Sequence, residues 1–381
     1  MIVKSLDIES TILNKGNAFD DRNQLCFVGI GDNIYDIEYK DVPYGEKLSQ
    51  IQAEIDSADL LVFINAKFDL HWIRKYGIKF DHKRLWDCQL VDFLLEGQTT
   101  SYPSMNSMAE KYTLPLKNDA IAEYWKAGIC TKDIPQAEIV SYLEHDLATT
   151  LAIYEKQKPL VEAKGVQFQR LVSLMHQDLV VLQEIEYNGL YFDEGMCLNK
   201  AVELSKQIDN LRMELNDYHN IDGFNTESGD HLSVLLYGGD IVIPRKELIG
   251  VYKTGDKKGL DKYGWKDYTY SLPRLFTPLK RTELKKEGYW ATGESVLRQL
   301  KSRDKASKRV IEVILSLAKM EKMVGTYYNG LPKLREKMNW KHNRLHGNLN
   351  QVTARTGRLS STKPNLQNIS TDMKSVFTSR Y

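Results

Sequence analysis

Residues 59–69 read DLLVFINAKFD, and this short stretch predicts a strand followed directly by a helix. The apolar run from Leu60 to Ile64 suits a strand that is buried on both faces. Asn65 suits the N-cap position of the helix, and Asp69 falls one turn later, beside the end of the strand. A buried strand joined to a helix in this way is typical of an α/β domain.

The residues on either side extend this pattern. Three short strands are predicted before it, at Met1–Ile8, Leu25–Ile30 and Asn33–Glu38, and Glu46–Ser57 has helical character. After it, the pattern is mostly helical to about residue 157. We therefore expect an α/β domain with a mixed sheet over residues 1–160.

Two further pairs of residues have spacings that bring side chains together. Asp7 and Glu9 are two apart on the first predicted strand, so both carboxylates project from one face of it. Tyr142 and Asp146 are four apart in a helical run, so they are neighbours on one helical face. Taken alone, each pair is most often a solvated edge or an ordinary packing contact, and Asp69 alone is an ordinary first-turn acid.

Together, these acidic elements predict a cation site. Four carboxylates brought into one place repel each other unless cations neutralise them. Oxygen-rich sites of this kind suit Mg²⁺ or Mn²⁺, and two such ions about 4 Å apart can activate a water and stabilise the leaving oxygen of a phosphodiester.

In order and spacing, Asp7-Ile8-Glu9, Asn65–Asp69 and Tyr142–Asp146 resemble the three motifs of proofreading 3′–5′ exonucleases, of the subtype with tyrosine in the third motif. The resemblance covers about residues 1–160 and implies an RNase H-like fold. It also implies that Asp7, Glu9, Asp69 and Asp146 hold two divalent metal ions, Mg²⁺ or Mn²⁺. It further implies that Tyr142 orients the attacking water, and that Leu13 and Asn65 help to place the terminal nucleotide.

The rest of the chain differs in charge. Residues 1–160 carry 17 Lys and Arg against 25 Asp and Glu, whereas residues 161–381 carry 35 against 26. A basic half suits a polyanion, although two solvated surfaces of accidental charge explain the difference equally well.

Residues 237–290 interrupt the helical pattern that surrounds them. They carry six tyrosines, two tryptophans, and 12 Lys and Arg against 7 Asp and Glu. We expect an inserted excursion rather than a helix pair. Its side chains suit backbone phosphates and unpaired bases, or a processivity or replisome factor, and a solvated loop packed by its own tyrosines is an equal alternative.

Residues 356–369 read TGRLSSTKPNLQNI, a polar, turn-rich string with basic side chains available for phosphates. The string is very similar to the segment that opens the palm of family A DNA polymerases, the DNA polymerase I family. The resemblance implies that Arg358 reaches the minor groove at the primer terminus and that Gln367 and Asn368 lie along the duplex. Lys363 is a further candidate for DNA binding.

The same resemblance extends backwards through residues 182–193, LQEIEYNGLYFD, which look like the start of a polymerase thumb. It implies a mainly helical thumb over residues 161–338 and the first edge of a palm over residues 339–381. We find no candidate for the palm carboxylates or for the nucleotide-binding lysine of the fingers. Apolar surface is therefore expected to be uncovered around residues 340–381. The first motif stands at residue 7, so no 5′-nuclease domain is expected before it, a layout typical of bacteriophage members.

Our leading hypothesis is the exonuclease and thumb part of a split family A DNA polymerase in DNA replication. It would bind a single-stranded 3′ end and a primer–template duplex, and a second polypeptide would carry palm and fingers. One alternative is a stand-alone 3′–5′ exonuclease. Another is a non-catalytic, clamp-like DNA-binding subunit, against which the intact motif residues argue.

Composition narrows the class of protein further. No window approaches the roughly 18 consecutive apolar residues of a membrane span, and no signal peptide is recognisable. The four cysteines are scattered without a CxxC pair, which argues against a disulfide framework or a zinc site. We expect a cytoplasmic protein with no membrane partner.

Overall fold

The computed structural model describes residues 1–39, 44–116, 120–302 and 304–379, and its chain forms two compact units. The first unit comprises Met1–Glu194 and Leu331–Tyr381, and the second comprises Gly195–Gly330. The boundaries of these two units differ from those of the three predicted ranges, 1–160, 161–338 and 339–381. The three ranges divide the chain by expected function and stay predictions. Residues 380 and 381, the end of the predicted palm range, lie outside the described residues.

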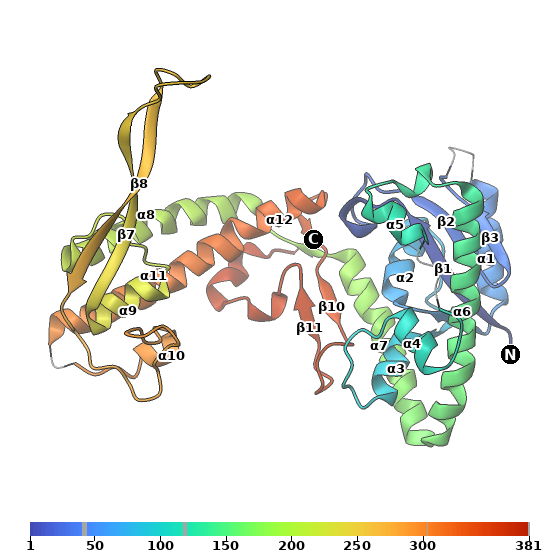
Figure 1. The fold of residues 1–381 in the computed structure, drawn as a ribbon. Coiled ribbons are helices and arrows are strands. Elements are labelled where there is room, and N and C mark those ends of the chain that lie inside the picture. The colour runs from blue at the N-terminus through green and yellow to red at the C-terminus, as the bar shows by residue number, and fades with distance from the viewer. Residues whose placement is uncertain (40–43, 117–119, 303, 380–381) are drawn as a thin grey trace. The chain divides into compact units, whose positions relative to one another are not determined.

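The first unit is built on a five-stranded mixed sheet, as predicted (Figure 1). Its strands in spatial order are β3 (Asn33–Asp36), β2 (Leu25–Ile30), β1 (Val3–Ser10), β4 (Leu60–Phe63) and β5 (Arg84–Asp87). The central strand β1 pairs antiparallel with β2 and parallel with β4, while β2–β3 is antiparallel and β4–β5 is parallel. The two kinds of pairing in one sheet confirm the predicted α/β fold class.

Helices cover both faces of this sheet. Helices α1 (Gly45–Ser57) and α2 (Ala66–Lys75) pack with Leu6 and Ile8 of β1 in the largest apolar core cluster. The 28-residue helix α6 (Gln136–Ala163) packs with Phe27 of β2 in a second cluster. The other helices of this part are α3 (Cys88–Leu95), α4 (Met105–Lys111), α5 (Ala120–Lys126) and α7 (Val166–Asn188). None of the helices in the described ranges is long and apolar enough to cross a membrane.

The element predictions hold for this unit with one omission. Strands β2, β3 and β4 and helix α1 lie where the sequence predicts them, and β1 starts two residues later than expected. Strand β5 was missed because Arg84-Leu85-Trp86-Asp87 is only four residues long and charged at both ends. Tertiary pairing with the buried strand β4, not local propensity, makes these four residues a strand.

The segment that resembles the start of a palm belongs to the first unit. Helix α12 (Gly330–Met338), of which all but Gly330 lies in this unit, comes directly before this segment, and β9 (Arg344–Leu345) within it pairs with β6 (Leu190–Tyr191). Strands β10 (Asn348–Asn350) and β11 (Ser360–Thr362) form a hairpin, followed by the 3₁₀ turns η4 (Leu366–Asn368) and η5 (Thr371–Val376).

The apolar surface expected to be uncovered around residues 340–381 is found only in part in the described residues of that range. Leu359 is 38% exposed, and four large apolar side chains are partly buried: Leu349, Leu366, Ile369 and Phe377. The pairing of β6 with β9 and the Phe192–Phe377 bridge place this segment against the rest of the first unit, which covers the other large apolar groups. The fully covered residues are Trp340, Leu345, Met373 and Val376.

The second unit is mainly helical. Helix α8 (Glu194–His219) enters it, and α9 (Gly229–Tyr237), α10 (Glu294–Leu297) and α11 (Lys305–Lys322) follow, with a π-helical segment at Met323–Tyr328. The break predicted at Asn188-Gly189 is confirmed, since α7 ends at Asn188 and Gly189 has a φ of +67°. The predicted excursion is a two-stranded antiparallel ribbon of β7 (Gly239–Val251) and β8 (Asp261–Leu272).

Candidate active site

Three of the four predicted carboxylates meet on one side of the sheet. One oxygen each from Asp7, Glu9 and Asp146 lies within 4.8 Å of the others. Asp7 and Glu9 share a face of β1, as their spacing predicts, while Ile8 enters the core behind them. Among the described residues, this is the group of three acidic, histidine or cysteine side chains with a spacing suited to a metal ion.

Close approach of helix α6 to the sheet brings Asp146 to this place. Gly29 is the β2 partner of Asp7, and a Cβ at Gly29 would lie 2.6 Å from Cδ1 of Leu147. Since real Cβ atoms do not approach so closely, the glycine allows the helix to pack directly over the strand pair. Asp146, next to Leu147, is thereby held beside Asp7 and is only 1% exposed.

Asp69 lies next to the cluster and is 2% exposed. Burial, followed by the charges of Asp7 and Asp87, raises the pKa of Asp69 well above its usual value. Crowding of this kind costs free energy when all the carboxylates are ionised, and a divalent cation would remove that cost. The donor set, four carboxylates with little access to water, therefore fits Mg²⁺ or Mn²⁺.

Tyr142 lies on the same face of α6 as Asp146, as predicted, and is 8% exposed. Its ring meets that of Trp125 edge to face, with centroids 5.7 Å apart. A neighbouring group that the sequence analysis did not single out is His145, whose Nδ1 lies 3.8 Å from Oδ1 of Asp146. The only signal in the sequence was that His145 directly precedes the predicted metal ligand Asp146.

Asn65 occupies the N-cap position of α2, but its side chain does not cap the helix. Its backbone is left-handed, with a φ of +63°, and Oδ2 of Asp87 instead accepts the Ala66 N–H at 2.7 Å. Oδ1 of the same aspartate accepts the N–H groups of Gln89 and Leu90 and so caps α3. The Asn65 side chain is therefore exposed and does not cap the helix. Asp87, which holds the first residue of α2, is a supporting residue that the sequence analysis missed.

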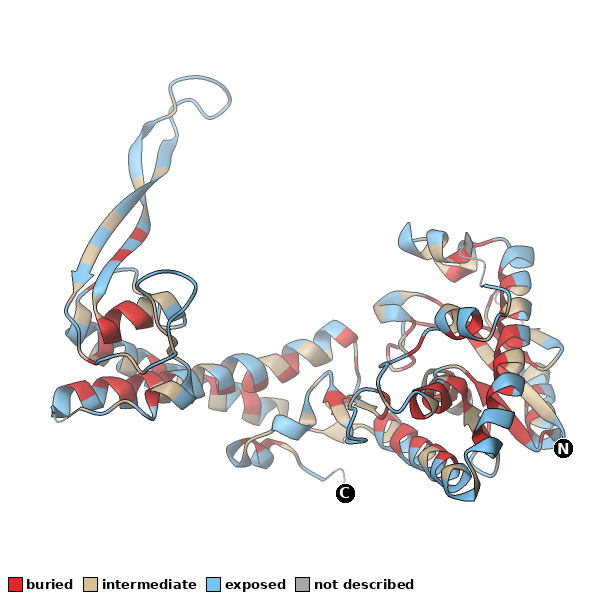
Figure 2. Cartoon of the chain, turned by 60° about the horizontal axis from the view of Figure 1, so that its bottom comes forward, coloured by how far each residue is buried: buried red, intermediate tan, exposed pale blue. Residues whose placement is uncertain are grey.

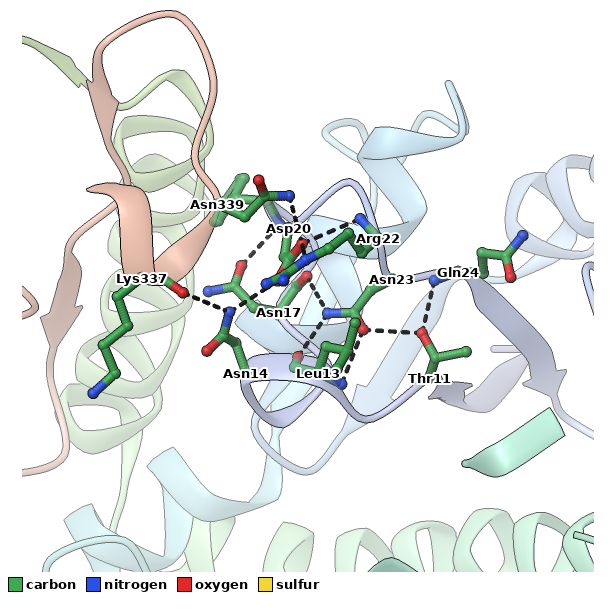
Figure 3. A network of polar contacts seen from close by, with 11 residues as sticks. Thr11, Leu13, Asn14, Asn17, Asp20, Arg22, Asn23, Gln24, Lys337 and Asn339 are labelled. Atoms are coloured by element: carbon green, nitrogen blue, oxygen red, sulfur yellow. Dashed lines mark hydrogen bonds and ion pairs between the residues drawn. The ribbon is translucent and has the colours of Figure 1, made fainter. Parts of the chain in front are cut away.

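Leu13 lies in the 3₁₀ turn η1 (Leu13–Lys15) after β1, and its side chain is 44% exposed. The buried Asn23 amide clamps its backbone: Oδ1 accepts the Leu13 N–H at 3.0 Å, and Nδ2 donates to the Leu13 carbonyl at 2.7 Å (Figure 3). Asn23 also bonds the Thr11 hydroxyl and the Asn17 carbonyl. This side chain therefore determines the shape of the turn that presents Leu13.

The same turn is tied to the end of α12 and to the residue that follows this helix (Figure 3). Nδ2 of Asn14 donates to the Lys337 carbonyl at 3.2 Å, and Nδ2 of Asn339 donates to Oδ1 of Asp20 at 2.8 Å. Burial opposes ionisation of Asp20, but hydrogen bonds from Arg22, Asn339 and Asn14 hold its pKa well below its usual range. Residues more than 300 positions apart thus share one polar network.

A second buried network surrounds Glu186 of α7, which is 4% exposed. Its carboxylate accepts from Nζ of Lys67 at 2.6 Å, from the Leu349 N–H at 2.5 Å and contacts Nε2 of His71 at 3.0 Å. Burial opposes ionisation, yet the His71 hydrogen bond and the Lys67 charge lower the pKa of Glu186. Burial also lowers the pKa of His71, although its hydrogen bond to Glu186 opposes this effect.

The predicted DNA-binding residues are spread over this unit. Asn65 and Lys363 line one cavity of about 650 Å³, together with Lys67, Phe68 and polar side chains of the β10–β11 hairpin. Arg358 and Asn368 are exposed outside that lining. Gln367 is also exposed, but its Nε2 donates to the Leu359 carbonyl at 2.7 Å and so closes its own loop.

Two protein-family models match the two ends of the chain. A 3′–5′ exonuclease model matches residues 4–162, which contain the whole carboxylate cluster. A DNA polymerase family A model matches residues 272–380, which contain the TGRLSSTKPNLQNI string. The β7–β8 ribbon lies almost entirely in the interval between the two matches.

The chain is also similar to curated bacterial proteins. It is 24% identical to DNA polymerase I of Rhizobium leguminosarum over 333 residues, which are 86% of this chain and 28% of that protein. It is 25% identical to DNA polymerase I of Chloroflexus aurantiacus over 350 residues, which are 91% of this chain and 32% of that protein. The chain thus spans about a third or less of the length of these relatives.

Among solved structures, the chain resembles the POL domain of Pol1 from M. smegmatis in complex with DNA primer–template and dNTP. The TM-score is 0.64 at 17% sequence identity, over 96% of this chain and 52% of the other. At this identity the likeness concerns the fold alone, and it supports the α/β fold class.

Proposed function

We propose that this chain, which is of the DNA polymerase I type with a 3′–5′ exonuclease domain and the start of a family A polymerase domain, removes nucleotides from 3′ ends of single-stranded DNA. The carrying observation is the meeting of Asp7, Glu9 and Asp146 within 4.8 Å inside the segment that the exonuclease family matches.

In this proposal, Asp7, Glu9, Asp69 and Asp146 would hold two divalent cations, Mg²⁺ or Mn²⁺. When bound, such ions supply an activated water and stabilise the leaving oxygen of a phosphodiester. Tyr142, one helical turn before Asp146, orients the water. Leu13, on the turn clamped by Asn23, and the exposed Asn65 place the terminal nucleotide. The low exposure of Glu9, Asp69 and Asp146 limits competing water and strengthens their interaction with a cation.

The test is digestion of a 5′-labelled 30-nucleotide oligo-dT, followed as a ladder of shortened products. Digestion is expected with Mg²⁺ or Mn²⁺ and is expected to stop in excess chelator. Titration calorimetry with Mn²⁺ gives a second readout: Asp7→Ala with Glu9→Ala should lose cation binding. Glu144→Gln is the control, because Glu144 is an exposed acid on α6, the helix that carries Asp146. Wild-type digestion that persists in chelator would refute the metal-dependent mechanism.

The polymerase-like end supports a second part of the proposal. Residues 331–379 hold primer–template DNA through Arg358, Lys363, Gln367 and Asn368, and nucleotide addition needs palm and fingers from further polypeptide. We expect that polypeptide to be a separate chain that acts with this one in DNA replication. Mixed with it, the chain should extend primers, and Arg358→Ala should slow extension more than digestion of single strands. Equal loss of both activities in Arg358→Ala would contradict the assigned role of this arginine.

A further inference from the structure

The β7–β8 ribbon projects from the helices of the second unit and is exposed along most of its length (Figure 2). At its base, Ile241 and Ile243 are buried against Ile221 and Val234. Beyond that base, no residue of the two strands is buried. A two-stranded ribbon that adds little to the core is only marginally stable by itself. Its exposed side chains are therefore candidates for binding a ligand rather than for stabilising the fold.

The two faces of the ribbon differ in chemistry. On one face, the Arg245 guanidinium lies over the rings of Tyr268 and Tyr270, at 4.9 and 5.5 Å from their centroids. The same arginine donates to the Asp222 carbonyl at 2.7 Å, and Glu247 accepts the Tyr268 hydroxyl. Most of the polar contacts of this face are thus made within the unit, although Nε of Arg245 is buried without a hydrogen-bond partner among the described residues.

The opposite face, here named the open face, carries Val242, Lys246, Leu248, Tyr263 and Trp265. The strand register places Lys246 opposite Trp265 and Leu248 opposite Tyr263, so these four side chains form two adjacent cross-strand pairs. Trp265 is 72% exposed and Tyr263 is 50% exposed. Two aromatic rings and a cation are therefore presented together to the solvent.

The tip of the ribbon adds positive charge. Residues 252–262 carry four lysines against two aspartates. The Nζ atoms of Lys257 and Lys262 each lie 5.9 Å from the centre of the Tyr252 ring. A third aromatic ring, beyond the open face, thus lies near two cations.

We propose that the open face and the tip of the ribbon bind single-stranded DNA. Tyr263 and Trp265 are two residues apart on one strand face, so their rings are about 7 Å apart, and each can accept one unpaired base. Lys246 and the tip lysines lie where they contact phosphates of the same strand. Stacking on aromatic rings needs free base faces, which a single strand offers and a duplex conceals.

This surface is distinct from the carboxylate cluster, and the proposal does not depend on cleavage. The test is fluorescence anisotropy of the full chain with labelled dT30 and with labelled dT5, in chelator so that no strand is digested. Tyr263→Ala with Trp265→Ala should weaken dT30 binding about tenfold or more, as expected for two lost stacking contacts. The pentanucleotide dT5 is too short to contact the aromatic pair and the tip lysines at the same time. Its binding should therefore change less than twofold.

Matched variants separate stacking from simple apolar contact. Trp265→Phe keeps a ring and should retain most of the affinity for dT30. Val242→Ala shortens an apolar side chain on the same face and should leave the affinity unchanged. Exchange of the four tip lysines, Lys253, Lys257, Lys258 and Lys262, for glutamine should reduce the slope of log K against log salt by about 0.7 for each lost phosphate contact.

Three outcomes would overturn the proposal. The first is an unchanged dT30 affinity in the double aromatic variant with an intact circular dichroism spectrum. The second is a duplex of equal length that competes as well as dT30 and whose affinity does not change in the double aromatic variant. The third is an effect of Val242→Ala as large as that of the aromatic pair, which would indicate general apolar contact rather than stacking of bases on the rings. Failure of the exonuclease proposal would leave all of these measurements unaffected.

Discussion

The carboxylate cluster and the open face of the ribbon gather charge in opposite ways. The cluster joins acids from positions 7, 9 and 146, on two different elements, of which Glu9 and Asp146 are buried and Asp7 is partly buried. The open face takes its groups from two neighbouring strands of one hairpin and leaves them in water. Bringing like charges together away from water destabilises the fold unless a cation binds between them. Exposed lysines and aromatic rings cost the fold little free energy and remain available to bind a polyanion. The comparison predicts that substitutions in the carboxylate cluster strongly reduce digestion of DNA. Substitutions on the open face should change the free energy of unfolding only slightly.

The sharpest separation of the two regions is a double exchange of the β1 acids. Asp7→Ala with Glu9→Ala should lower digestion of single-stranded DNA by at least 10³-fold, because it removes two groups that would hold the cations. Binding of dT30 in chelator should remain within twofold of wild type, since the ribbon is untouched. A parallel fall of both quantities would show that the two regions do not act separately.

The next effect concerns Glu186, the buried acid beneath helix α2. Because hydrogen bonding and the Lys67 charge lower its folded pKa, its stabilising contribution is complete above the unfolded pKa of about 4.5 and is lost as pH falls through the folded value. His71, with a pKa lowered by burial, also reduces stability as pH falls. Glu186→Gln leaves Lys67 without its buried partner and should cost about 3 kcal/mol at pH 7.

Urea unfolding at pH 7 and pH 3.5 measures this contribution. The difference in stability between the two pH values should be smaller for Glu186→Gln than for wild type. Glu184→Gln, on the same helix, is the control. An equal pH dependence in both proteins would mean that the Lys67–Glu186 contact does not stabilise the fold.

A smaller effect is expected at Asn23. Asn23→Ala leaves the backbone N–H and carbonyl of Leu13 without their amide partner and should cost about 2 kcal/mol. If the clamped turn places the terminal nucleotide, KM for single-stranded DNA should rise more than kcat falls. The exposed Asn210→Ala serves as control. A fall in kcat with unchanged KM would assign the turn to the chemical step instead.

The smallest effect should be on the ribbon itself. Leu248 is 57% exposed, so Leu248→Thr removes apolar surface that the fold does not bury, and threonine suits a strand. The free energy of unfolding should change by less than about 0.5 kcal/mol. A loss above about 2 kcal/mol in thermal or urea unfolding would show that the open face is packed in solution and would break the comparison.

The amino-acid sequence by itself determined the local elements and the identity of the acidic residues. Two-residue spacing on β1 and four-residue spacing on α6 follow from the periods of strand and helix, so the shared faces of Asp7 with Glu9 and Tyr142 with Asp146 were predictable. The Asn188-Gly189 break and the interruption at residues 237–290 were also visible, because glycine-rich punctuation and loss of helical periodicity are local signals.

Tertiary structure alone decided which distant residues support the site. The Asn23 clamp on Leu13, the Asp87 contact with the Asn65 turn and the link between Asn339 and Asp20 join positions whose separation carries no periodic signal. It also decided which apolar groups of the described part of residues 340–379 are covered, such as Trp340 and Met373, where an uncovered surface was expected. The physical reason is that spacing determines which side chains share a face, whereas only packing of one element on another determines what that face meets.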